Sequence, residues 1–322
     1  MRTVLLFGTI CVALHAQQPT LAVVEKIAGA VGFYSATGQR IAGVKVGTHP
    51  HEIIYSPDKR YLYVTNNGIL WMEYAGEGGN TISVIDAKTR QSAGVIDLGN
   101  HRRPHGMDID PKTGRLVVTT ENPDGLLLVD TKTRKVLRKY DVKGEDPHMV
   151  TLDANAEWAY VSNSTTNTIA AIHLESGNVK LIPSDKRPQG GVLSRDGKLI
   201  FITNADGNSI SIIDPAKQTR IGAIPTGRSP GRVAQTPDRK TLVYCLGQGE
   251  AVGFADIATR QQTGIIPLGG RPLSLTMSAD GKLAYAGVQD QDKVYVISVA
   301  ERKILRVIQT PKGSGPDPAL PL

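Results

Sequence analysis

The sequence predicts an all-β fold, a seven-bladed β-propeller with four strands in each blade, and three observations lead to it. A segment anchored by a proline recurs with a period in the low forties. Within each period, four short runs rich in β-branched and aromatic residues are separated by turn residues such as Gly, Pro, Asp and Asn. The two ends of the chain supply complementary fragments of one further repeat.

The repeat is clearest in "HPHEIIYSPDKRYLYVTN" at positions 49–66, and it returns as "RPHGMDIDPKTGRLVVTT", "DPHMVTLDANAEWAYVSN" and "RPQGGVLSRDGKLIFITN". Weaker copies are "SPGRVAQTPDRKTLVYCL" and "RPLSLTMSADGKLAYAGV". Successive anchors are 54, 43, 41, 42, 42 and 44 residues apart, and they are Pro50, Pro104, Pro147, Pro188, Pro230, Pro272 and Pro316. A period of this length with four strands per unit is typical of propeller blades.

The blade number follows from the ends of the chain. Residues 21–47, "LAVVEKIAGAVGFYSATGQRIAGVKVG", match the second, third and fourth strands of a repeat, and the C-terminal "GSGPDPALPL" matches only the start of one. Six complete repeats and these two fragments make seven blades. The ring is therefore expected to be closed by three N-terminal strands plus one C-terminal strand, which removes open sheet edges.

On the segments "YLYVTN", "AYVSN" and "IFITN", the chain resembles the YVTN-type β-propeller repeat proteins of bacteria and archaea, over essentially all of the expected mature chain. Related seven-bladed propellers include quinoprotein dehydrogenase heavy chains, the propeller of nitrous-oxide reductase and lactonases of the 6-phosphogluconolactonase type. Such repeats specify packing, so the resemblance implies the fold and leaves the function open.

Residues 1–16 have the features of a signal peptide: the charged Arg2, a short apolar stretch and the small residue Ala16. We expect residues 17–322 to form the propeller, in a protein that is periplasmic or secreted and monomeric, with no membrane span. Cys245 is then the only cysteine, which excludes an internal disulfide and a Cys-x-x-Cys-His haem attachment. The net charge of +7 comes without the basic runs typical of nucleic-acid binding.

Candidate site residues follow from strand direction. Strands alternate within a blade, so the turn before each anchor proline and the loop between the second and third strands lie on one face. The residues after the prolines should ring the channel mouth there, and they are His51, His105, His148, Gln189, Gly231, Leu273 and Asp317.

Imidazoles and a carboxylate are ligands for a divalent transition metal such as zinc or copper, so we take His51, His105, His148 and Asp317 as candidate metal ligands. The alternative is that they only form hydrogen bonds at the channel mouth.

The first repeat interval is longer than the others, and its extra residues fall on this same face. "NGILWMEYAGEGG" offers Trp71 and Tyr74, and "GNHRRPH" offers Arg102 and Arg103. Trp71 either covers the mouth or packs on the blade edge. With Gln189 and the turn residues Arg187, Arg228 and Arg271, these are the candidate ligand-binding residues, and their charge favours a small anion. Glu121, at the end of an inner strand, and His105 are the candidate catalytic residues.

Three functions remain open at this point. The first is an exported propeller that binds a small anionic ligand, a metal ion or a protein partner on the loop-rich face. The second is a metal- or histidine-dependent hydrolase, lyase or isomerase of the lactonase type, acting on a small anionic or sugar-derived substrate. The third is a redox accessory subunit. The sequence does not decide whether the protein is an enzyme.

Overall fold

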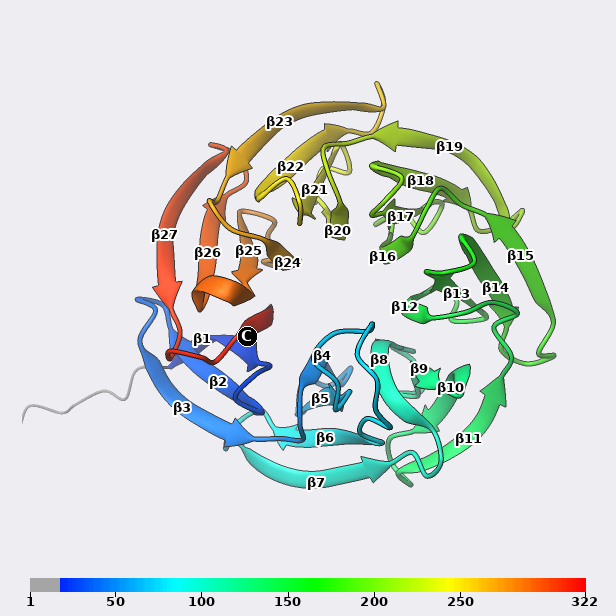
Figure 1. Cartoon of the computed structure of the whole chain (residues 1–322), viewed down its shortest axis with the longest axis horizontal. Coiled ribbons are helices and arrows are strands. Elements are labelled where there is room, and N and C mark those ends of the chain that lie inside the picture. The colour runs from blue at the N-terminus through cyan, green and yellow to red at the C-terminus, as the bar shows by residue number, and fades with distance from the viewer. Residues whose placement is uncertain (1–17) are drawn as a thin grey trace, which may run out of the picture.

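The computed structural model describes residues 18–322, and these form seven four-stranded antiparallel sheets arranged as a ring (Figure 1). The predicted all-β, seven-bladed propeller is therefore confirmed. The expected signal peptide, residues 1–16, lies outside the described residues. Among residues 18–322, no helix is long and apolar enough to cross a membrane.

The blades are numbered here from the first complete repeat, and each is given from its innermost to its outermost strand. Blade 1 is β4 (Pro50–Tyr55), β5 (Tyr61–Asn66), β6 (Thr81–Asp86) and β7 (Gln91–Asp97). Blade 2 is β8 (Arg102–Ile109), β9 (Leu116–Asn122), β10 (Asp124–Asp130) and β11 (Lys135–Tyr140). Blade 3 is β12 (Pro147–Leu152), β13 (Trp158–Asn163), β14 (Thr168–His173) and β15 (Val179–Pro183).

The second half of the ring has the same order. Blade 4 is β16 (Pro188–Leu193), β17 (Ile200–Asn204), β18 (Ser209–Asp214) and β19 (Thr219–Pro225). Blade 5 is β20 (Pro230–Gln235), β21 (Thr241–Leu246), β22 (Ala251–Asp256) and β23 (Gln261–Pro267). Blade 6 is β24 (Pro272–Met277), β25 (Leu283–Val288), β26 (Lys293–Ser298) and β27 (Lys303–Gln309), with a short 3₁₀ helix, η1 (Gln289–Gln291), between β25 and β26.

Blade 7 joins the two ends of the chain. Its inner strand is β28 (Pro316–Pro321), which pairs antiparallel with β1 (Pro19–Glu25), followed by β2 (Ala30–Ser35) and β3 (Arg40–Lys45). The pairing places Ala319 opposite Val23, and both residues are buried. The closure by three N-terminal strands and one C-terminal strand is as the sequence predicted.

The hydrophobic core lies between neighbouring blades. Second and third strands are apolar on both faces, as in β5 and β6, because each middle strand is covered by the blades before and after it. One cluster joins blades 1 and 2 through Tyr63, Ile82, Met107 and Val118. Outer strands are largely exposed and contribute little to the core, with one buried residue each in β7 (Ile96) and β27 (Ile308).

A recurring backbone feature sets the start of the inner strands. The residue before the anchor proline has a left-handed φ in six blades, at His49, Arg103, Asp146, Arg187, Ser229 and Gly315. This conformation turns the chain from the outer strand of one blade into the channel wall of the next. It places the residue after the proline at the channel mouth.

The closing strand gives the first testable prediction. Removal of residues 319–322 deletes the last β1 pairings and exposes Val23 and Leu21, which are buried in the closed ring. We expect the free energy of unfolding to fall by on the order of 3 kcal/mol from lost burial and strand pairing. Denaturant titration of full-length and truncated protein measures this. An unchanged midpoint would show that the closure contributes nothing to stability.

Candidate functional site

A cavity of about 280 Å³ opens at one mouth of the central channel. Its walls come from the inner strands of blades 1 to 7 and from the β5–β6 loop, residues 67–80, here called the lid loop. The tip of that loop, residues 69–73, forms part of the lining. Figure 1 shows the light-blue segment that follows β5 reaching toward the middle of the ring.

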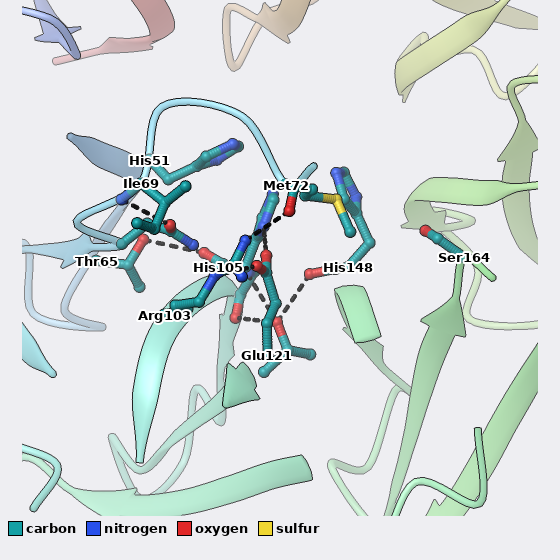
Figure 2. Close-up of polar contacts among 12 residues, drawn as sticks. His51, Thr65, Ile69, Met72, Arg103, His105, Glu121, His148 and Ser164 are labelled. Carbon is teal, nitrogen blue, oxygen red and sulfur yellow. Dashed lines mark hydrogen bonds and ion pairs between the residues drawn. The ribbon is translucent and has the colours of Figure 1, made fainter. Parts of the chain in front are cut away.

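Three imidazole rings stand side by side in this cavity, and His51, His105 and His148 are called the histidine cluster below. The ring centroids of His51 and His105 are 3.8 Å apart, and those of His105 and His148 are 4.1 Å apart. All three residues are buried, with exposed fractions of 9%, 2% and 6%. Figure 2 shows His105 between the other two, with Met72 of the lid loop beside His148.

The backbone of the cluster is fixed from the neighbouring blade by threonine. The Thr65 hydroxyl on β5 donates to the carbonyl of His105 at 2.9 Å, and the Thr119 hydroxyl on β9 donates to the carbonyl of His148 at 2.8 Å. Each hydroxyl also accepts a backbone N–H from the inner strand of its own blade, from Glu52 and Gly106 respectively. The "T" of the YVTN-like segment thus joins two blades at the residue that follows the anchor proline.

His105 is held by an acid on the second strand of its own blade. Glu121 Oε1 makes a very short contact with His105 Nδ1, and both side chains are 2% exposed. Arg103 Nε lies 2.9 Å from the other oxygen of Glu121. An ionised carboxylate only accepts hydrogen bonds, so in contact with ionised Glu121 the Nδ1 of His105 carries a proton. Within the described residues the Nε2 of His105 is buried and has no hydrogen-bond partner.

His51 meets the closing blade. Its Nε2 lies 3.9 Å from Asp317 Oδ2, and Asp317 forms a buried ion pair with Lys26 at 3.3 Å. Asp317 comes from the C-terminal strand and Lys26 from the turn between β1 and β2, so this wall of the cavity exists only when the ring is closed.

An ion pair crosses the channel at the cavity. Glu52 on β4 makes a very short contact with Arg232 on β20, and the two side chains are 10% and 12% exposed. Blades 1 and 5 are not neighbours, so this pair has to bridge the channel. Arg232 also lines the cavity, which is called the funnel below.

The electrostatics keep two of the imidazoles neutral. Burial lowers the pKa of His51 well below its ordinary value, and the neighbouring His105, Lys26 and Arg232 lower it further. Burial lowers the pKa of His148 in the same way, with added repulsion from His105 and Arg232. At neutral pH both rings are uncharged, so they offer one N–H and one lone pair each.

Not all residues predicted from the sequence meet at the cavity. Those that line it are His51, His105, His148, Gln189, Asp317, Arg187, Arg271 and Trp71. Arg103 and Glu121 stand behind His105, Arg102 pairs with Glu77, and Arg228 donates to Gln248. Tyr74 is 55% exposed and does not line the cavity. His49 stays in the turn before Pro50 and is also absent from the lining.

Sequence reasoning missed Lys26, Arg232 and Glu52. Arg232 and Glu52 stand two residues after the anchor proline, where the other five repeats have the uncharged residues Gly106, Met149, Gly190, Ser274 and Pro318, so two charges at an otherwise uncharged position were the available signal. Lys26 occupies in blade 7 the place that Glu121 has in blade 2, as the strand registers show.

The cluster does not form a metal site as it stands. When imidazoles share one metal ion with metal–nitrogen distances of about 2.0–2.1 Å, their ring centroids lie roughly 4.5 Å or more apart. Here the ring centroids are only 3.8 Å apart for His51 and His105, and 4.1 Å apart for His105 and His148. Among residues 18–322, no group of three or more His, Cys, Asp or Glu side chains is arranged to hold a metal ion. Within that same range, His51 Nδ1, His105 Nε2 and His148 Nδ1 are buried without hydrogen-bond partners, so the donor chemistry fits and the spacing does not.

Fold and site together define a propeller with a polar cavity at one channel mouth. The family comparison is more specific. The choice-of-anchor I domain model matches residues 5–184, more than half of the sequence, so the chain belongs to that family. The narrower resemblance to YVTN-type proteins stays a prediction. No match was found among curated proteins.

Solved structures share the fold at low identity. A functionally unknown protein from Desulfotomaculum acetoxidans DSM 771 is 16% identical with a TM-score of 0.79, over 94% of this chain and 99% of that one. Kuenenia stuttgartiensis hydrazine synthase is 19% identical, with a TM-score of 0.68 over 81% of this chain and 86% of that one. The dihydro-heme d1 dehydrogenase NirN, solved in complex with DHE, is 15% identical, with a TM-score of 0.69 over 94% and 75%.

The threonine contacts give a second prediction. Thr119→Val keeps the shape of the side chain but leaves the Gly106 N–H and the His148 carbonyl without their hydroxyl partner. We expect the free energy of unfolding to drop by about 2–3 kcal/mol. Thr133→Val, on an exposed turn, is the control and should change it by less than about 0.5 kcal/mol. Urea titration compares the two, and equal effects would contradict the bridging role.

Proposed function

We propose that this chain is an exported binding protein that holds a small anionic ligand in the funnel. The charge of the lining is the observation that carries the proposal. Lys26, Arg187, Arg232 and Arg271 line the cavity, against only two carboxylates, Glu73 and Asp317. With the histidines counted as neutral and Glu52 included as the partner of Arg232, four positive and three negative side chains leave an excess of one positive charge, and in a partly enclosed cavity such an excess attracts anions.

The histidine cluster suits the same ligand. Neutral imidazoles donate and accept hydrogen bonds without adding a charge that must be desolvated. The cavity volume of about 280 Å³ limits the ligand to a small molecule. A carboxylate, phosphate or sugar acid fits this combination of size, charge and polarity.

Arg271 provides the direct test. It lines the cavity and, among residues 18–322, forms no ion pair, so its charge is available to a ligand. Calorimetry with inorganic phosphate, malonate and citrate should find binding by the wild type, and Arg271→Gln should weaken it about tenfold.

Arg239→Gln is the matched control, because Arg239 pairs with Asp196 in exposed turns and does not line the cavity. That variant should bind like the wild type. An equal loss in the two variants, or no binding of any of the three anions by the wild type, would argue against an anion site.

A transition metal is the second candidate, and the unpartnered nitrogens of the histidine cluster favour it. Binding would require the rings to separate slightly from their present packing. His105→Ala removes the central ring and should abolish zinc or copper binding, whereas His49→Ala, in the turn outside the cavity, should leave it nearly intact. Titration calorimetry of the wild type and both variants with zinc and with copper measures this. If the wild type binds neither metal, the metal-binding proposal is wrong and the histidine cluster is only a polar part of the cavity wall.

Two other functions remain proposals with less support. The pair His105–Glu121 has the form of a base oriented by an acid, which a lactonase-like hydrolase, lyase or isomerase could use. A redox accessory role has only the distant likeness to two enzymes behind it, and at 15% and 19% identity this likeness supports the fold alone. The family's description, choice-of-anchor, supports a protein at the cell surface or outside the cell.

A further inference from the structure

The lid loop has a firm base and a weakly held tip. At the base, Gly68 N donates to Thr48 O at 2.9 Å, Gly79 N to Asn67 O at 2.7 Å, and Arg103 N to Gly79 O at 2.7 Å. Glycines with positive φ stand on both sides of the tip, at positions 68, 76 and 78. A side chain on Gly78 would come within 2.3 Å of Arg103 Cγ, so the base is packed closely against that arginine.

Three contacts hold the tip over the cavity, and two of them are weak. Glu73 pairs with Arg187 at 3.1 Å, but the side chains are 65% and 41% exposed, and such surface pairs contribute little. Lys26 Nζ lies 5.8 Å from the ring centroid of Trp71. The third contact is a 2.7 Å hydrogen bond from an Arg103 terminal nitrogen to the Met72 carbonyl. Its donor is charged and its side chain is only 14% exposed, so it is the strongest of the three.

Arg103 also faces the histidine cluster. Its Nε lies 2.9 Å from Glu121, and Glu121 contacts His105 Nδ1 (Figure 2). One guanidinium thus contacts the lid tip and, through one carboxylate, the ring at the centre of the cavity. In the described residues the Glu121 carboxylate pairs with His105 and Arg103 and with no residue of the lid loop.

We propose that Arg103 is a positioning residue that makes closure of the lid loop and the orientation of His105 interdependent. With the tip closed, the Met72 carbonyl and Glu121 hold the guanidinium between them. When the tip opens, Arg103 loses one of these partners and can turn toward solvent, so the Glu121–His105 pair loses its positive neighbour. Because the two contacts share one guanidinium, linkage makes their effects reciprocal: a change that weakens the Arg103–Glu121 contact weakens the hold on the tip by the same free energy. This coupling is independent of the ligand.

The neighbouring Arg102 is a matched control within the chain. It also contacts the lid loop, through the Gly78 carbonyl at 3.3 Å and Glu77 at 3.4 Å, but it does not contact Glu121. Its side chain is 37% exposed. If an arginine at the base of the lid loop only stabilises that loop, replacing Arg102 and replacing Arg103 should have similar effects. An effect on His105 is expected only for Arg103, because only Arg103 contacts Glu121.

The experiment compares Arg103→Gln, Glu121→Gln and Arg102→Gln with the wild type by two readouts. Amide hydrogen exchange of residues 69–74 reports tip opening, and the ¹⁵N chemical shifts of His105 report its tautomer and partner. Arg103→Gln should speed tip exchange about tenfold, as expected for loss of a charge-assisted hydrogen bond, and should shift the His105 nitrogens. Glu121→Gln should do both as well, although Glu121 does not touch the lid loop. Arg102→Gln should leave the His105 shifts unchanged.

Two results would overturn the proposal. One is a Glu121→Gln variant that shifts His105 while tip exchange stays at the wild-type rate. The other is an Arg103→Gln variant that opens the tip without moving the His105 signals. Arg103→Lys separates coupling from misfolding, because an ammonium group keeps the charge but cannot contact both partners with the same geometry. It should retain the wild-type unfolding midpoint, while tip exchange becomes faster than in the wild type and the His105 nitrogen signals shift.

Discussion

The candidate site depends on a hydroxyl shared between neighbouring blades. Thr65, Thr119 and Thr203 each accept an N–H from their own inner strand and donate to the carbonyl after the anchor proline of the next blade, at His105, His148 and Gly231. In blade 6 the equivalent of the threonine is Gly287, and the Ser274 hydroxyl occupies the space to donate to Asp317 O. The same contact that holds the ring together therefore fixes the backbone of the residues that line the channel mouth.

Ring closure and site formation are consequently one event. Lys26 and Asp317 come from the two ends of the chain, and each is about 3% exposed in their ion pair. A buried charge without its partner is strongly destabilising, so in the closed ring each of these two residues requires the other. The ion pair between Glu52 and Arg232 adds a second constraint across the channel. One of these ion pairs joins the two ends of the chain and the other joins blades 1 and 5, so the cavity wall to which they contribute depends on all of these parts being in place.

The sequence predicted the parts of this structure that repeat. Blade number and closure follow from spacing, and strand alternation brought His51, His105 and His148 to one mouth with Arg187, Arg271 and Trp71. Departures from the repeat were harder to interpret. Arg103, predicted to bind ligand, and Glu121, predicted to be catalytic, lie behind His105, because a one-residue difference along a strand decides which way a side chain faces. The ion pair that crosses the channel joins residues 180 positions apart, and no local pattern predicts such a contact.

The three unpartnered imidazole nitrogens show what the rigid ring makes possible. A buried polar group without a hydrogen bond costs about 1–3 kcal/mol, so a cluster with three of them is stable only if other interactions hold its residues in place. The shared hydroxyls and the inter-blade core supply that support, and they act on the backbone rather than on the rings. Among residues 18–322, these three nitrogens therefore have no hydrogen-bond partner and sit on a backbone that is already held in place. This arrangement would favour the proposed binding of a small polar ligand, because less of the cost of ordering is left to the binding step.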